Sequence, residues 1–115
     1  MTKEDWKKRL ALYDELISNT PEIERKGKTM PYTSENTYMF SLLNKDGEIG
    51  IRLSKELRQE YADELGEEIY KSYGAVMKDY VLVPEAVLEN PEKFSFYLRK
   101  SRDYVSSLEP QPRKK

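Results

Sequence analysis

The stretch YMFSLLNKDGEIGIRL, from Tyr38 to Leu53, decides the fold, because it has the pattern of a β-hairpin. Two runs of apolar and β-branched residues flank the dipeptide Asp46-Gly47. Asp-Gly between such runs is typical of a tight turn, since a type I′ turn needs a positive φ at both central residues. The sequence therefore predicts two antiparallel strands that are joined at Asp46-Gly47.

The register of this hairpin is predicted from the positions of its apolar side chains. With a two-residue loop, Leu42 faces Ile51 and Phe40 faces Leu53, so the apolar residues share one face. A three-residue loop with a glycine bulge would put Leu42 opposite Gly50 and divide the apolar set. We therefore expect the two-residue loop. The shared face would hold Tyr38, Phe40, Leu42, Ile49, Ile51 and Leu53.

The composition predicts one small domain with a heavily solvated surface. At 115 residues the chain is long enough to bury one hydrophobic core. Its 20 basic and 21 acidic side chains nearly cancel, and its mean hydropathy is -0.86, which indicates a thin core rather than disorder. The net charge of -1 argues against the uniformly basic surface of many nucleic-acid-binding proteins.

Two residue types that carry much of enzyme chemistry are missing from the sequence. Without cysteine there is no disulfide, thiolate zinc site or cysteine nucleophile, and without histidine the usual general base is missing. No run approaches the ~20 apolar residues that span a bilayer, and the charged start MTKEDWKKRL is unlike a signal peptide. We therefore expect a cytoplasmic protein that is not an enzyme, binds no cofactor and has no membrane partner.

Two helices are predicted on either side of the hairpin. Thr2 is a suitable N-cap for a helix whose apolar residues recur every three or four positions up to Ile17. Ser54 is a suitable N-cap for a second helix over residues 55–65, and Gly66 stands where a C-cap glycine belongs. Each of these helices has one apolar face to pack against a sheet.

The remaining segments complete an α+β pattern. Residues 33–36 are typical of a loop, residues 75–83 of a strand, and Asn90-Pro91 of a helix start. The sequence therefore predicts an α+β fold, in which an antiparallel sheet built on the central hairpin is packed by N-terminal and C-terminal helices. We expect one domain over residues 1–108, followed by a flexible basic tail, residues 109–115.

Two long segments, taken with this order of elements, resemble a known family. They are TYMFSLLNKDGEIGIRLSKELRQEYADEL, residues 37–65, and YVLVPEAVLENPEKFSFYLRKSRDYV, residues 80–105. They resemble the N-terminal domain of the TfoX/Sxy family over residues 5–106, best at Met39-Phe40, at the hairpin and at residues 83–92. The MmcQ/YjbR-like proteins share the same layout and are a close second match.

The resemblance implies a compact α+β domain from a class that regulates natural competence genes in bacteria. It implies no catalytic residues, because the family has no established enzymatic activity. Family members often carry a glycine-rich MFGG-like loop before the hairpin, whereas the corresponding Met30 to Ser34 has no glycine. We therefore expect a stand-alone regulatory or protein-interaction domain, without the second helical domain of the full-length regulators.

A nucleic-acid-binding accessory protein is the alternative function, and it would use Arg25, Lys26 and Lys28. These side chains would contact phosphates weakly, without reading base sequence. The same charges would also protect an edge strand from pairing with another molecule, and the acidic net charge favours this second explanation. An edge strand could also pair two copies of the chain into a homodimer, which one sequence does not decide.

Aromatic side chains predict a surface for an unknown protein partner. The nine tyrosines are more than a core of this size needs, although a ring with a solvated hydroxyl also fits the rim of a core. The candidate contact residues are Tyr32, Tyr70, Tyr73 and Phe96. Of these, Phe96 lies off the apolar face of the last helix, so its ring is expected at the surface. The acidic run over residues 56–68 lacks the spacing of an EF-hand, so it indicates a solvated face rather than a metal site.

Overall fold

The structure is a computed structural model that describes residues 2–66, 70–72 and 75–111. Its elements in chain order are α1 (Lys3–Ser18), β1 (Tyr32–Glu35), β2 (Tyr38–Leu43), β3 (Ile49–Arg52), α2 (Lys55–Leu65), β4 (Lys71–Ser72), β5 (Ala75–Val76), β6 (Tyr80–Leu82), α3 (Glu85–Leu88) and α4 (Pro91–Ser106). Four strands form an antiparallel sheet in the order β1-β2-β3-β6, and β4 and β5 form a separate two-stranded ribbon. The predicted α+β class, with the hairpin at the centre of the sheet, is confirmed.

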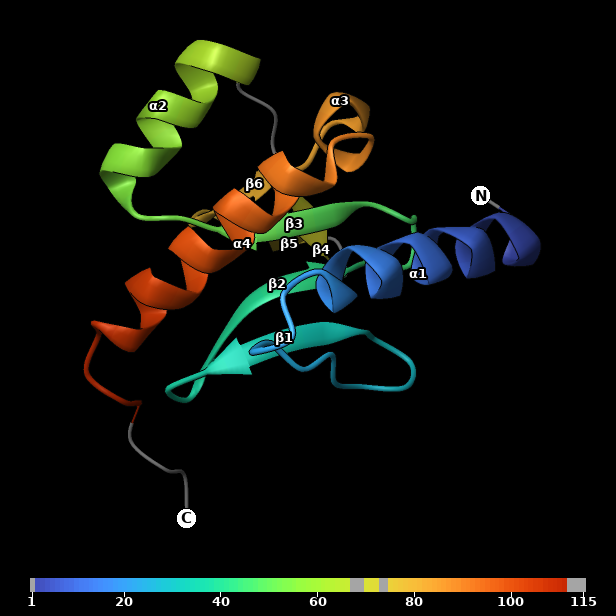
Figure 1. Cartoon of the computed structure of the whole chain (residues 1–115), viewed down its shortest axis with the longest axis horizontal. Helices are drawn as coiled ribbons and strands as arrows, with labels where there is room; N and C mark the ends of the chain where they lie inside the picture. Colours follow the sequence, from blue (N-terminus) through green and yellow to red (C-terminus); the bar gives the residue numbers. More distant parts are fainter. Residues whose placement is uncertain (1, 67–69, 73–74, 112–115) are drawn as a thin grey trace.

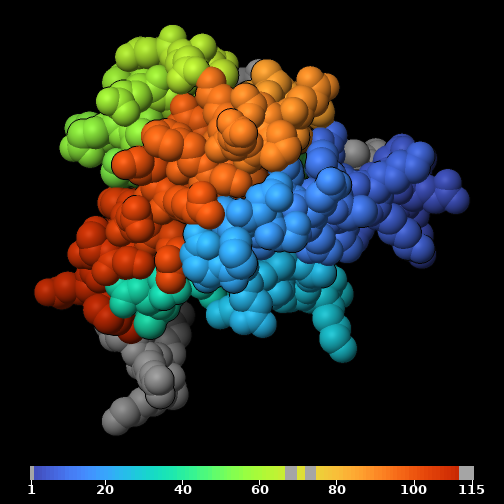
Figure 2. Space-filling model, viewed as in Figure 1, coloured from blue at the N-terminus to red at the C-terminus, as the bar shows by residue number. Residues whose placement is uncertain are grey.

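The elements lie in three layers, with the sheet in the middle. α1 and α4 lie in front of the sheet, and β4 and β5 lie behind it (Figure 1). In the space-filling view the two helices cover most of the sheet on the visible face, and α2 lies beside α4 (Figure 2). α4 contacts β1, β2, β3 and α1. The prediction that N-terminal and C-terminal helices pack on the sheet is therefore confirmed.

The first helix begins and ends where the sequence predicts. The Thr2 hydroxyl accepts a hydrogen bond from the backbone N–H of Asp5 at 3.1 Å, which satisfies one of the free N–H groups of the first turn. The helix ends at Ser18, shortly before Pro21, which cannot continue it. None of the helices within the described ranges has the length and apolar character needed to cross a membrane.

The chain reverses at Asp46-Gly47, but through a three-residue loop. The backbone N–H of Asn44 donates to the Glu48 carbonyl at 2.9 Å, and the N–H of Gly47 donates to the Asn44 carbonyl at 3.1 Å. Gly47 has a φ of 77°, the left-handed conformation that a glycine bulge requires. The Asn44 side-chain oxygen accepts from the N–H groups of Asp46 and Glu48 at 3.0 and 2.8 Å, which fixes the loop.

The predicted register of the hairpin is therefore wrong by one residue. Leu42 pairs with Gly50 and Ser41 pairs with Ile51. Opposite residues of an antiparallel pair share a face, so the side chain of Leu42 points away from the face that holds Ile51. The prediction assumed that only one face of the sheet is apolar, whereas Leu42 is fully buried on the other face.

Tyr70 explains why a glycine faces Leu42. A Cβ atom on Gly50 would lie 2.5 Å from the Tyr70 ring, so no larger residue fits below this ring. The Tyr70 hydroxyl donates to the carbonyl oxygens of Leu42 and Glu48 at 3.1 and 3.2 Å. The ring stacks on Tyr80 with 6.1 Å between centroids. Tyr70 therefore buries the centre of the second face, at Leu42 and Gly50, and Tyr80 packs beside it.

Residues 33–36, predicted as a loop, belong mostly to β1, and this prediction is wrong. Thr33 is buried and its hydroxyl lies 2.5 Å from the Ser41 hydroxyl, so a polar pair holds the two strands together. The register shifts between Thr33 and Ser34, which pair with Ser41 and Met39 and skip Phe40. This bulge turns the Phe40 side chain into the core on the helix face.

The later elements follow the predicted end signals, with one interruption. The Ser54 hydroxyl accepts from the N–H of Leu57, the second helix ends before Gly66, and Asn90 caps α4. The strand predicted over residues 75–83 is divided, because the chain turns at Lys78-Asp79 between β5 and β6. The main core lies between the helices and the sheet. It includes Tyr13, Leu16, Phe40, Leu43, Ile49, Ile51, Leu53, Val87, Phe94, Leu98 and Val105.

The predicted tail is described as far as Gln111. The N–H of Gln111 donates to the Thr37 hydroxyl at 2.7 Å, and the Tyr38 hydroxyl donates to the Glu109 carbonyl at 2.5 Å. These bonds attach the start of the tail to the turn between β1 and β2. Residues 112–115 lie outside the described residues.

Candidate functional site

The basic residues predicted to contact nucleic acid have intramolecular partners in two of three cases. Arg25 forms two hydrogen bonds with the Asp14 carboxylate, at 2.7 and 3.2 Å, and a third with the Gly27 carbonyl. The Lys26 ammonium donates to the Ser34 hydroxyl at 3.1 Å. Lys28 is exposed. Arg25 therefore holds the loop after α1 in place, and its guanidinium is already occupied.

Both edges of the sheet carry intramolecular partners. Lys26 and Tyr32 exchange two backbone hydrogen bonds at 2.7 and 2.9 Å, so the loop after α1 covers part of the β1 edge. At the other edge the Tyr61 hydroxyl of α2 donates to the Leu82 carbonyl of β6 at 3.1 Å. The homodimer through an edge strand stays a prediction, and the intramolecular bonds at both edges do not favour it.

The four aromatic candidates do not form one surface. Tyr70 is only 1% exposed, so the prediction that it contacts a partner from the surface is wrong; its ring fills the space above Gly50. Tyr32 pairs with Leu42 and therefore lies on the same side of the sheet as Tyr70. Tyr73 lies outside the described residues. Phe96 is 50% exposed on the helix side, as its position off the apolar face of α4 predicts.

Phe96 lies in an open groove between α2 and α4. The groove has a volume of about 530 Å³, and its apolar wall consists of Leu57, Phe96 and Tyr104. Leu57 comes from α2 and the two aromatic rings from α4. A half-exposed Phe is unusual at the surface of a monomeric protein when it continues into an apolar groove, and such patches are typical of interaction sites.

α2 forms one wall of this groove and is attached to α4 by a small set of side chains. The Tyr61 and Tyr97 rings pack edge to face with 5.0 Å between centroids. Glu64 pairs with Lys93 and accepts a hydrogen bond from the Tyr97 hydroxyl. The hydrogen bond from Lys93 holds the pKa of the Glu64 carboxyl below its usual value. Burial, with Glu64 nearby, raises the pKa of Tyr97.

The other end of the groove is fixed by Arg52 at the end of β3. Its guanidinium lies 5.8 Å from the centroid of the Tyr104 ring and 5.1 Å from that of Tyr38, distances that allow cation–π attraction. The same guanidinium forms an ion pair with Asp79 at 3.5 Å. These contacts hold the Tyr104 ring against the end of the sheet, so this wall of the groove is preformed.

The rim of the groove is mainly acidic. Glu56 and Glu60 lie on α2 and Asp103 lies on α4, so carboxylates stand on both sides. Lys100 is the one cation among the described lining residues, and its ammonium lies 5.6 Å from the Phe96 ring centroid. The groove therefore offers an apolar floor to a ligand that carries positive charge. Among the described residues, no group of three acidic side chains is arranged to hold a metal ion.

Sequence reasoning found Phe96 but missed Leu57 and Tyr104. Their spacing places both on the apolar face of their helix, which predicts that they pack on the core, but both are only partly buried. The sequence carries no signal for this, because the groove depends on how far α2 stands from α4. No family model, curated protein or solved structure matches the chain significantly.

Proposed function

We propose that this protein is a non-enzymatic protein-interaction module that binds its partner in the groove between α2 and α4. One observation carries the proposal: Phe96 is 50% exposed at the mouth of an apolar groove of about 530 Å³. Burying such a ring in an interface contributes about 1.5–3 kcal/mol. Aromatic anchors in preformed pockets often dominate binding energy.

The partner that suits this groove is an amphipathic helix with basic residues. A groove between two helices accepts the apolar face of a third helix. The acidic side chains Glu56, Glu60 and Asp103 on the rim would then pair with Lys or Arg on the flanks of that helix. Such pairs at the rim contribute modestly to affinity and mainly speed association and select the partner.

The resemblance to the TfoX/Sxy N-terminal domain supports a regulatory setting for this interaction. Within the proposal, the module would act in the control of transcription, competence genes included, by binding another protein rather than by catalysis. The nucleic-acid-binding alternative has less support, because Arg25 is bound to Asp14 and Lys26 to Ser34. Only Lys28 of the three basic residues has no described partner.

A defined peptide tests the groove without knowledge of the natural partner. The probe is a synthetic amphipathic helix of Leu and Lys, titrated into isotopically labelled protein and followed by NMR. We expect chemical-shift changes at Leu57, Phe96 and Tyr104, and micromolar to millimolar affinity. Phe96→Ala should weaken binding about tenfold, which corresponds to about 1.4 kcal/mol.

Two controls make the experiment specific. A peptide of the same length made of Leu and Glu should bind much more weakly, because the rim is acidic. Tyr32→Ala, on the opposite side of the sheet, should leave the affinity for the Leu/Lys peptide unchanged. If Phe96→Ala binds as well as the wild type, or if both peptides bind equally, the groove is not the docking site.

A further inference from the structure

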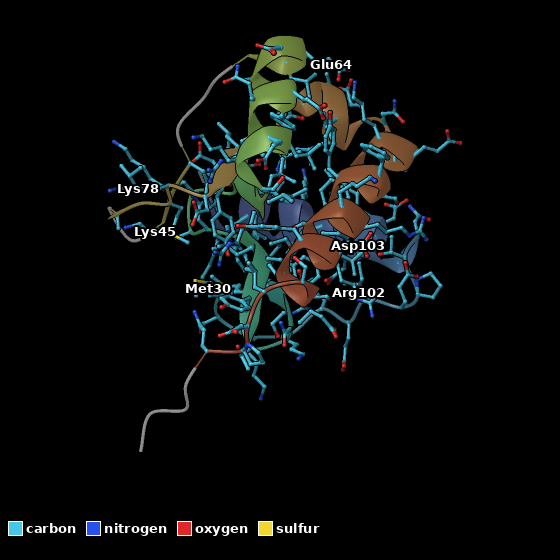
Figure 3. All side chains as sticks on the ribbon, turned by 90° about the vertical axis from the view of Figure 1, so that its left-hand side faces the viewer. Met30, Lys45, Glu64, Lys78, Arg102 and Asp103 are labelled. Carbon is cyan, nitrogen blue, oxygen red and sulfur yellow. The ribbon has the colours of Figure 1, made fainter. Side chains whose placement is uncertain are left out.

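A second hollow lies on the opposite flank of α2. It has a volume of about 300 Å³ and lies between α2 and the segment that carries β5 and β6. In the side-chain view, Lys78 lies on one side of α2 and Asp103 of the α4 groove lies on the other (Figure 3). The two hollows are therefore separate sites, and a ligand in one does not require a ligand in the other.

The charge of this second hollow is opposite to that of the groove. Its charged lining residues within the described ranges are Lys55, Arg58 and Lys78, all basic. Arg58 forms an ion pair with Asp79 at 2.6 Å, which takes up part of its charge. Lys55 and Lys78 are exposed and have no ion pair among the described residues. Two lysines without an ion pair among the described residues thus line one small cavity.

The rest of the wall is aromatic and apolar. The stacked rings of Tyr70 and Tyr80 form part of it, with 6.1 Å between centroids and an angle of 25° between the planes. Val76, which also lines the hollow, is 50% exposed. A volume of about 300 Å³ lies at the lower end of the range for small-molecule sites. An apolar wall with two cations at its mouth suits a flat organic body with one negative group.

We propose that the hollow between α2 and the β5–β6 segment binds a small organic anion with an aromatic body. Lys55 and Lys78 hold the anionic group, and Val76 and Tyr80 contact the ring system. This site is independent of the proposed protein-binding groove, because the two hollows share no lining residue.

The test uses two fluorescent probes that differ in charge. Anilinonaphthalene sulfonate carries an aromatic body with one sulfonate, and N-phenylnaphthylamine has the same kind of body without the charge. Wild-type protein should bind the sulfonate, and the affinity should fall as salt is raised, because exposed cations are screened. The double variant Lys55→Gln/Lys78→Gln should bind the sulfonate about four- to ninefold more weakly, at two- to threefold for each cation.

The uncharged probe and a variant in the other groove are the controls. N-phenylnaphthylamine should bind the wild type and the double variant within a factor of about two, since no charge is involved. Lys100→Gln removes a cation from the α4 groove and should leave the affinity for the sulfonate unchanged. Far-UV circular dichroism should be the same for all three proteins, since the substituted lysines are exposed.

Three results would overturn the proposal. The first is that the native wild-type protein does not bind the sulfonate. The second is that the double variant binds it as tightly as the wild type does. The third is that Lys100→Gln weakens binding as much as the double variant, which would place the probe in the groove between α2 and α4.

Discussion

The two faces of the sheet are stabilised in different ways. On the helix face, side chains from α1, α3, α4 and the strands form one continuous core, with Phe94 and Leu98 fully buried. On the second face, Tyr70 and Tyr80 cover Gly50 and Leu42, and the hydroxyl of Tyr70 bonds to the hairpin backbone. The comparison teaches that the centre of a small sheet can be buried on both sides even where one face is covered by an aromatic side chain instead of a helix.

The largest effect is expected from emptying the core on the helix face. Phe94 is fully buried between α4 and the sheet, so Phe94→Ala removes a whole ring and leaves a cavity. We expect the free energy of unfolding to fall by about 3–5 kcal/mol. Urea denaturation followed by circular dichroism measures this change.

Phe96→Ala is the matched control, because it removes the same ring from the same helix. Phe96 is half exposed and packs on the edge of Tyr97 with 5.2 Å between centroids. The free energy of unfolding should change by less than about 0.5 kcal/mol. Similar losses for both variants would mean that Phe96 is a core residue and would remove the reason to place a partner on it.

Alkaline pH should weaken both faces through their buried tyrosines. Burial raises the pKa of Tyr13 and Tyr70 above the usual value, and it raises the pKa of Tyr80 from 10.0 to about 12. Below pH 10 these tyrosine hydroxyls stay protonated in both the folded and the unfolded chain, so they do not change the free energy of unfolding. Above pH 10 the unfolded chain releases the proton first, so stability falls as pH rises from 10 toward 12.

For Tyr80 this loss amounts to about 2–3 kcal/mol by pH 12. Between neutral and alkaline pH, the free energy of unfolding of Tyr80→Phe should therefore fall less than that of the wild type. Urea denaturation of both proteins at several alkaline pH values checks this, with tyrosinate absorbance as the second measurement. Parallel curves for the two proteins would show that Tyr80 is solvated and that the second face is open.

A methyl group at Gly50 tests how tightly the second face is packed. Replacing a strand glycine with alanine usually stabilises a protein by about 0.5–1 kcal/mol. Here the added Cβ would meet the Tyr70 ring at 2.5 Å, so we expect Gly50→Ala to destabilise by about 1–3 kcal/mol. Combining it with Tyr70→Leu should recover part of this loss. A neutral or stabilising Gly50→Ala would mean that the ring moves aside freely.

The same contact explains which part of the fold could be predicted from the sequence. The helices, their caps and the reversal at Asp46-Gly47 depend on neighbouring residues, and local patterns predict them. The register depends on Tyr70, which is about twenty residues after Gly50 in the chain. A one-residue shift of the register exchanges the two faces. Only knowledge of the distant Tyr70 ring shows that Gly50 is a site of close packing and not a break in the apolar pattern.

The candidate site shows the same limit. Phe96 could be predicted, because its place outside the apolar face is a property of one helix. The grooves on either side of α2 could not, because they combine residues from α2 with residues from α4 or from β6. The predicted set Tyr32, Tyr70 and Phe96 failed as one surface for the same reason, since the sheet separates the first two residues from the third.

The smallest effect is expected from removing one hydroxyl on each face. On the helix face the Tyr13 hydroxyl lies 2.6 Å from that of Ser41, which in turn lies 2.5 Å from that of Thr33. Tyr13→Phe leaves the other two hydroxyls bonded to each other, so we expect a loss of about 0.5 kcal/mol. Tyr70→Phe removes the donor that joins the ring to the hairpin carbonyls, and we expect about 1–1.5 kcal/mol.

The difference between the two variants shows what holds each face, because both retain the ring. A larger loss for Tyr70→Phe would mean that the second face depends on the hydrogen bonds of one side chain, whereas the helix face depends on packing volume. Urea denaturation under identical conditions measures both losses. If Tyr13→Phe causes the larger loss in the free energy of unfolding, the hydroxyls of Ser41 and Thr33 depend on the Tyr13 hydroxyl as a hydrogen-bond partner. The helix face would then be held by these hydrogen bonds as well as by its apolar core.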